Sequence, residues 1–179
     1  MKWSYPAGSL DALIASDAVT APTRAALQAR GQRGTRPAFF TRDEFTGLTV
    51  MVARLAPWPE LAPVIASAID ARLAAGTGNG WRFATLPDDG AAYRMLLGLL
   101  DAGNFRGLGP MAQDDLLLGV QSRPDAARAF EDLLAEVSEL AFAQPAALAA
   151  IGYTGFADAP GWTAIQLDEC EPREAIEHG

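Results

Sequence analysis

Residues 40–57, with the sequence FTRDEFTGLTVMVARLAP, decide the fold class because they hold a helix with both ends marked. Thr41 and Glu44 have the spacing of a capping box, in which each side chain accepts a hydrogen bond from the other residue's backbone N–H. Apolar residues then recur every three or four positions and form one helix face: Phe45, Leu48, Val52 and Leu55. Pro57 and Pro59 end the helix.

Four further segments show helical spacing of apolar residues, at about residues 60–75, 88–102, 110–121 and 124–142. In the third of these segments, the residues expected to face inward are Met111, Leu116, Leu117 and Val120. The last segment has the strongest pattern, and its expected polar side carries Glu131, Asp132, Glu136 and Glu139. With short loops between them, these segments predict an all-α fold, a helical bundle of about five helices.

The two ends of the chain differ from this bundle. Residues 1–37 are expected to form an N-terminal arm and linker, with a short helix capped by Ser9 and another opened by Pro22. Residues 38–145 form the predicted bundle. Residues 146–179, which are rich in glycine and aromatic residues, are expected to form an irregular tail that packs on the bundle or on a partner.

Composition excludes several classes of protein. The chain has 179 residues, of which 50% are apolar and 20% charged, and this is typical of a globular domain. Its net charge of -8 argues against nucleic-acid binding and suits a partner with a basic face. We expect no direct membrane insertion, because no apolar run approaches the ~20 residues of a membrane span. No signal peptide or twin-arginine motif is visible, so we expect a cytoplasmic chain, with a periplasmic chain as the alternative if the N-terminus was trimmed.

Residues that bear chemistry are few. Cys170 and His178 are the single cysteine and histidine, which rules out an intrachain disulfide and disfavours a zinc site. The glycine-rich residues 76–80 (GTGNG) lack the Lys-Ser/Thr of a phosphate-binding loop, and we interpret them as a helix stop.

Clustered carboxylates also have plain interpretations. The pairs at 88–89 and 114–115 are expected near helix starts, where acidic groups favour the helix dipole. Acidic residues at 168–174 suit a solvated tail, and a hard cation is the alternative. The sequence therefore predicts no catalytic, cofactor-binding or metal site in this chain.

Aromatic residues outside the predicted helices are the candidate partner-binding residues: Trp58, Tyr153, Phe156 and Trp162. Two interpretations remain open. These side chains complete the core of the bundle, or they lie against a partner, since aromatic residues are enriched in interface cores.

Three features, in order, resemble the small third subunit of gluconate 2-dehydrogenase and its relatives. The first is FFTRDEF at 39–45, followed by a helix to ARLAP at 53–57. The second is LGPMAQDDLL at 108–117, which is similar to the family's L-s-p-x-q-q-D-x-L-L stretch. The third is the helix at 130–142, followed by IGYTG at 151–155 and Gly161-Trp162. The likeness covers roughly residues 38–173, although Thr154 stands where the family often has proline.

The resemblance implies a partner rather than an activity of this chain. Relatives of this kind associate with a large flavoprotein dehydrogenase of the glucose–methanol–choline class, which holds FAD and the catalytic base. The small subunit helps the folding, stability or export of the large one. We therefore expect a non-catalytic accessory subunit of an FAD-dependent sugar or polyol dehydrogenase. Alternatives are a stand-alone helical adaptor with an unrelated partner, and an enzyme that uses the acidic tail and His178.

Overall fold

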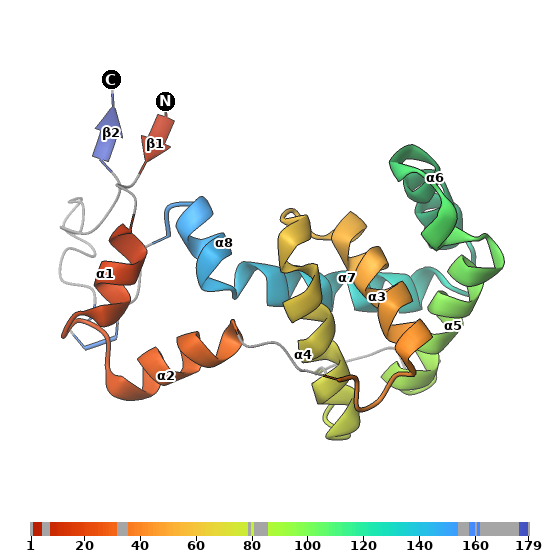
Figure 1. Cartoon of the computed structure of the whole chain (residues 1–179), viewed down its shortest axis with the longest axis horizontal. Helices are drawn as coiled ribbons and strands as arrows, with labels where there is room; N and C mark the ends of the chain where they lie inside the picture. Colours follow the sequence, from red (N-terminus) through yellow and green to blue (C-terminus); the bar gives the residue numbers. More distant parts are fainter. Residues whose placement is uncertain are drawn as a thin grey trace. The chain divides into compact units, whose positions relative to one another are not determined.

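The computed structural model describes residues 2–4, 8–31, 36–78, 80, 86–153, 158–159, 161 and 176–178. Within these residues the fold is all-α, as the sequence predicts, with eight α-helices, two 3-10 turns and one pair of three-residue strands (Figure 1). The chain divides into two units. One is residues 33–141, and the other combines residues 1–32 with residues 142–179.

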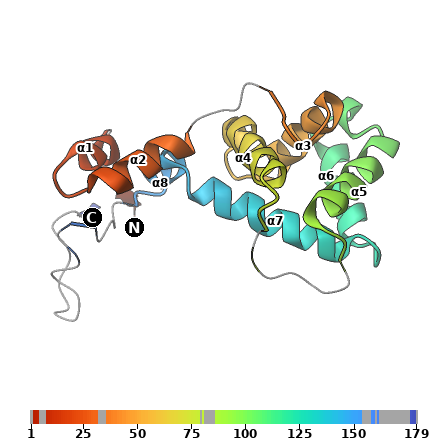
Figure 2. The same ribbon diagram turned by 90° about the horizontal axis from the view of Figure 1, so that it is seen from below.

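The unit at 33–141 contains most of the helices predicted for the bundle. They are α3 (Arg42–Leu55), the 3-10 turn η1 (Pro59–Leu61), α4 (Ala62–Ala74), α5 (Asp89–Ala102), the 3-10 turn η2 (Phe105–Gly107), α6 (Pro110–Gln121) and α7 (Ala127–Phe142), whose last residue belongs to the other unit. α3 and α4 lie side by side, and α7 runs along one side of α3, α4 and α5 in both views (Figures 1 and 2). The last predicted helix begins three residues late, because residues 124–126 form a turn.

The core of this unit comes from the apolar faces of α3, α4, α5 and α7. Its large, fully buried side chains include Leu48, Met51, Val52, Ile65, Ile69, Tyr93, Leu96, Leu133 and Val137. Burying one such aliphatic side chain stabilises a fold by roughly 1.5–3 kcal/mol. The three- and four-residue spacing seen in the sequence therefore becomes a shared core.

The start of α3 is fixed by the predicted capping box. The backbone N–H of Glu44 donates to the hydroxyl of Thr41 (3.2 Å), and the N–H of Thr41 donates to the carboxylate of Glu44 (2.8 Å). These two bonds satisfy N–H groups that have no partner within the helix.

A buried carboxylate on α4 holds the segment before α3. The side chain of Asp70 accepts hydrogen bonds from the backbone N–H groups of Ala38 (2.6 Å), Phe39 (3.1 Å) and Phe40 (2.9 Å). Hydrogen bonds to a charged group contribute about 1.5–3 kcal/mol each. Asp70 therefore anchors the entry to the unit, although the sequence pattern alone gave no sign of it.

The other unit contains both ends of the chain. Its elements are the antiparallel strand pair β1 (Lys2–Ser4) and β2 (Ile176–His178), and the helices α1 (Ser9–Ala15), α2 (Ala21–Arg30) and α8 (Pro145–Ala150). From α2, the guanidinium of Arg24 donates to the carbonyls of Ile14 (2.7 Å), Ser16 (2.8 Å) and Val19 (2.9 Å). One side chain thus fastens the turn between α1 and α2.

Two expectations about the ends are corrected. Ser9 does not occupy the N-cap of α1. Gly8 does, with a left-handed φ of 78° that glycine adopts at little cost. The tail is not irregular throughout, because Pro145 opens α8 at a first helical position, where the missing N–H costs nothing.

The end of α8 explains part of the tail motif. Gly152 has a left-handed φ of 69° and donates its N–H to the carbonyl of Ala149 (3.1 Å), while Tyr153 donates to Leu148 (2.8 Å). This pair of bonds is a Schellman motif, which ends helices at a glycine. The Ile151-Gly152-Tyr153 part of the family-like ending is therefore a helix stop.

Candidate functional site

An ionic network links α4, α5 and α7. Arg72 donates from Nε to Glu136 Oε1 (2.6 Å) and from Nη2 to Oε2 (2.8 Å), which makes a bidentate pair. The Nη1 group of Arg72 donates to Asp89 (2.7 Å) and to the carbonyl of Thr77 (2.7 Å). The side chain of Glu136 is only 3% exposed and that of Arg72 is 15% exposed. Burial of Glu136 is tolerated because both carboxylate oxygens have donors.

Tyr93 completes this network from α5. Its hydroxyl donates to Glu136 Oε2 (2.7 Å). Burial and the negative charge of Glu136 raise the pKa of the tyrosine well above its ordinary value, so the hydroxyl stays protonated. Burial alone would lower the pKa of Arg72, but its hydrogen bonds and ion pairs with Glu136 and Asp89 raise it, so the guanidinium stays charged. The sequence placed Glu136 on a polar face, and that expectation is wrong because Arg72 and Tyr93 cover it.

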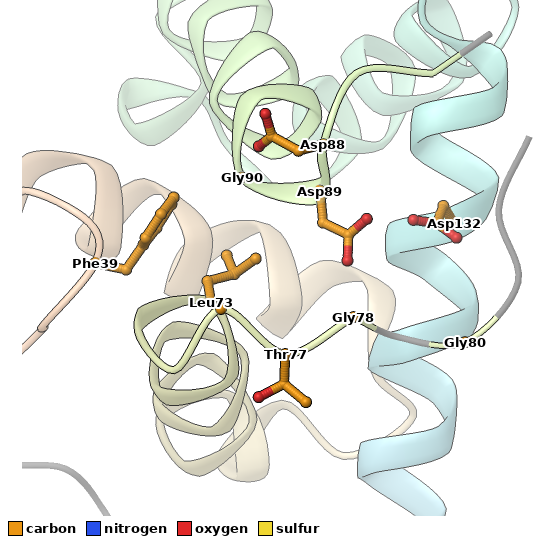
Figure 3. Close-up of a pocket in the computed structure, with 10 residues that line it drawn as sticks. Phe39, Leu73, Thr77, Gly78, Gly80, Asp88, Asp89, Gly90 and Asp132 are labelled. Carbon is orange, nitrogen blue, oxygen red and sulfur yellow. The ribbon is translucent and has the colours of Figure 1, made fainter. Parts of the chain in front are cut away.

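A pocket of about 430 Å³ lies beside the network (Figure 3). Its described lining is Phe39, Leu73, Gly76, Thr77, Gly78, Gly80, Asp88, Asp89, Gly90 and Asp132. Figure 3 shows Asp89 from α5 and Asp132 from α7 directed toward the same space. Burial, followed by the charges of Asp89 and Glu136, raises the pKa of Asp132. Negative charge is therefore in excess on this side of the pocket.

The glycine-rich wall of the pocket is a helix end. Gly76 has a left-handed φ of 65° and donates its N–H to Leu73 (3.0 Å), and Thr77 donates to the carbonyl of Arg72 (3.2 Å). These bonds form a second Schellman motif. The helix stop predicted for residues 76–80 is therefore confirmed at Gly76 and Thr77.

The pocket carboxylates already have structural roles. Asp88 caps α5 by accepting the N–H of Ala91 (2.9 Å), and Asp89 is held by Arg72. Within the described residues, no three His, Cys, Asp or Glu side chains are grouped so that they could hold a metal ion. The pocket favours a positively charged or hydrogen-bond-donating group, but two of the three acidic residues in its described lining, Asp88 and Asp89, serve the fold.

A different kind of surface lies on α6. Among the described residues of the 33–141 unit, the large apolar side chains that are exposed are Met111 (82%) and Leu118 (59%). The expectation that Met111 faces inward is wrong, because α6 buries Gln113, Leu117 and Val120 on its opposite side.

The carboxylates of α6 also differ from expectation. Asp114 and Asp115 lie beyond the first turn of the helix, so they do not serve its N-terminus. Asp114 accepts from Arg54 of α3 through both oxygens (2.6–2.9 Å). Asp115 is exposed and makes no ion pair or hydrogen bond within the part of the chain that the structure describes.

The predicted partner-binding aromatics fall in different places. Trp58 is half-buried at the start of η1, in the 33–141 unit. Tyr153 is 44% exposed and follows α8 in the other unit, where Ile151 and Phe142 are also exposed. Phe156 and Trp162 lie outside the described residues, as do Cys170 and the acidic residues 168–174. His178 lies in β2.

None of the described helices is long and apolar enough to cross a membrane. Comparison with protein-family models, with curated proteins and with solved structures found no match to this chain.

Proposed function

We propose that this chain is a non-catalytic small subunit that binds and stabilises, or helps to mature, a larger FAD-dependent dehydrogenase of sugars, glycosides or polyols. The proposal starts from the ordered likeness to the third subunit of gluconate 2-dehydrogenase. It gains support from where the likeness falls in the fold, because two of the three family-like stretches carry exposed apolar side chains.

The observation that carries the proposal is this exposure. The stretch at 108–117 forms the start of α6 and carries Met111, and the stretch beginning at 151 carries Ile151 and Tyr153. Each of these side chains is 44% exposed or more. An exposed apolar patch is typical of protein–protein contacts, and each of the two stretches is a candidate for one by itself. The remaining family-like stretch, at 39–45, instead holds the fold together through the capping box and Asp70.

In this proposal the chemistry belongs to the partner. The large subunit holds FAD and the base, and takes a hydride from the carbinol carbon of the substrate. This chain contributes binding free energy only. A ligand that binds only the native state stabilises it by about 2.7 kcal/mol when present at 100 times its dissociation constant. The large subunit would thereby fold and retain FAD more readily.

Co-expression with a flavoprotein encoded beside this chain tests the proposal. The soluble fraction is separated by size exclusion while absorbance is read at protein and flavin wavelengths. We expect a yellow complex that contains both chains, and an insoluble or FAD-poor large subunit when this chain is omitted. Separate elution, with a fully active flavoprotein that does not need this chain, would contradict the proposal. The alternative, a helical adaptor for an unrelated protein, would then lead.

A further inference from the structure

One face of α6 combines exposed apolar and small residues with one carboxylate. We define the α6 stripe as Met111, Asp115 and Leu118, flanked by Ala112 and Gly119, all of which are exposed. Positions 111, 115 and 118 lie along one side of a helix over about two turns. The stripe lies opposite the face that α6 buries.

The large apolar residues exposed in the described part of this unit lie together and are not scattered over its surface. Within the described residues of the 33–141 unit, the exposed large apolar side chains both lie on this stripe. Single exposed apolar residues are normal on protein surfaces, but two on the same side of one helix form a patch. Gly119 adds space beside them, because a Cβ there would meet nothing within 4 Å. A glycine in a helix interior costs roughly 0.5–1 kcal/mol relative to alanine, and here it leaves room for a close approach by another chain.

Asp115 restricts what can cover the stripe. It lies between Met111 and Leu118 and has no ion-pair or hydrogen-bond partner in the described part of the chain, whereas its neighbour Asp114 is paired with Arg54. Covering the apolar residues would also remove water from Asp115. An unpaired carboxylate in such a place is costly, so the covering surface must supply a cation or hydrogen-bond donors. Of these two, a cation also complements the net charge of -8 of this chain.

Two other occupants fit poorly. If two copies of α6 paired antiparallel about the middle of the stripe, Asp115 would lie close to Asp115 of the second copy, with no cation between them. The net charge of -8 adds further repulsion between copies. An anionic lipid surface would be repelled for the same reason.

We propose that the α6 stripe docks an apolar segment of the large subunit that presents a Lys or Arg side chain to Asp115. The identity of the partner rests on the proposed function, whereas the chemistry of the segment follows from the stripe. Apolar side chains of the segment cover Met111 and Leu118, and its backbone approaches at Gly119.

A competition experiment tests this docking. Wild-type and variant full-length chains, each with a different tag, are co-expressed with the flavoprotein, and the ratio captured on the flavoprotein is measured. The stripe variants are Asp115→Lys and the double variant Met111→Ser with Leu118→Ser. The control is Glu139→Lys, since Glu139 is an exposed carboxylate of α7 with no ion pair or hydrogen bond among the described residues.

We expect each stripe variant to be captured at least about tenfold less than wild type, the loss that a hot-spot residue at the centre of an interface causes. The control should match wild type. Asp115→Asn gives a second measure that misfolding would not reproduce. Its deficit relative to wild type should shrink as salt rises, because only the charged pair is screened.

The outcomes separate the two proposals. If the flavoprotein captures no wild-type chain, both fail. If it captures wild type and the stripe variants equally, only the docking surface is wrong. If the stripe variants instead change self-association of this chain and leave capture unchanged, the occupant is a second copy and the docking proposal is overturned.

Discussion

α7 and α6 differ in which side chains they bury and which they expose. α7 buries a carboxylate, Glu136, and surrounds it with donors from Arg72 and Tyr93. α6 exposes Met111 and Leu118 and leaves Asp115 without an ion pair or hydrogen bond among the described residues. Both helices belong mainly to the 33–141 unit.

The difference separates charged groups that are satisfied within the fold from exposed groups that the described chain does not cover. A buried charge is tolerated only where its hydrogen bonds are made, so the network around Glu136 is complete within the chain. The α6 stripe exposes two large apolar side chains, and nothing in the described chain covers them. The acidic pocket, although it is the more obvious cavity, therefore suggests a ligand less strongly than the α6 stripe suggests a partner.

The largest expected effect comes from breaking the network on α7. Glu136→Ala should lower the free energy of unfolding by about 3–5 kcal/mol, because Arg72 would be left with a buried, partly unpaired charge. Urea denaturation followed by circular dichroism measures the change. Glu139→Ala, on the exposed side of the same helix, should change stability by less than about 0.5 kcal/mol. Equal effects of the two variants would show that Glu136 is not held as described.

Two glycines test the contrast between closed and open surfaces. At Gly90 on α5 an added Cβ would overlap the ring of Phe39, which is fixed by Arg94 stacked 4.1 Å from its centre. Gly90→Ala should therefore destabilise by about 1–3 kcal/mol. Gly119→Ala on α6 meets open space and should stabilise by roughly 0.5–1 kcal/mol. Thermal unfolding of the two variants gives the signs, and a stabilising Gly90→Ala would contradict the packing at Phe39.

A smaller effect concerns Asp132, at the edge of the network. Burial and the charges of Asp89 and Glu136, only partly offset by the charge of Arg72, raise its pKa in the folded state above the ordinary value of 3.8. The folded state then binds more protons than the unfolded state, so this group costs stability as pH rises from about 3.8 through the folded pKa.

Asp132→Asn should remove that loss. We expect the melting temperature to rise at pH 7 and to change little at pH 3.5. Calorimetry at several pH values measures the difference between variant and wild type. A gain that is the same at every pH would mean that repulsion between carboxylates is not its cause.

The sequence predicted the helices well, because helical spacing and caps are local. The capping box at Thr41 fixes the start of α3, and proline at 110 fixes that of α6. The burial of Glu136 and of Asp70 could not be predicted, since a periodic pattern defines a face but not which distant helix covers it. Their partners lie 30 or more residues away.

The α6 stripe could not be predicted from the sequence, for a related reason. Apolar residues occur around much of α6, so periodicity could not tell the buried Leu117 from the exposed Met111 and Leu118. Nor did the sequence indicate that residues 1–32 and 142–179 form one unit, because the pairing of β1 with β2 joins opposite ends of the chain. The signal that was available for the stripe is an acidic residue between two large apolar ones at helical spacing.

The most direct test of the accessory-subunit proposal is site-specific photo-crosslinking in the co-expressed complex. A photoreactive residue replaces Leu118 in one variant and Glu139 in another, and the products are identified by mass spectrometry. We predict a crosslink from position 118 to a segment of the large flavoprotein that contains Lys or Arg, and none from position 139. A crosslink from position 139 but not from position 118 would contradict docking through α6. No crosslink and no shared elution with a flavoprotein would contradict the proposed function itself.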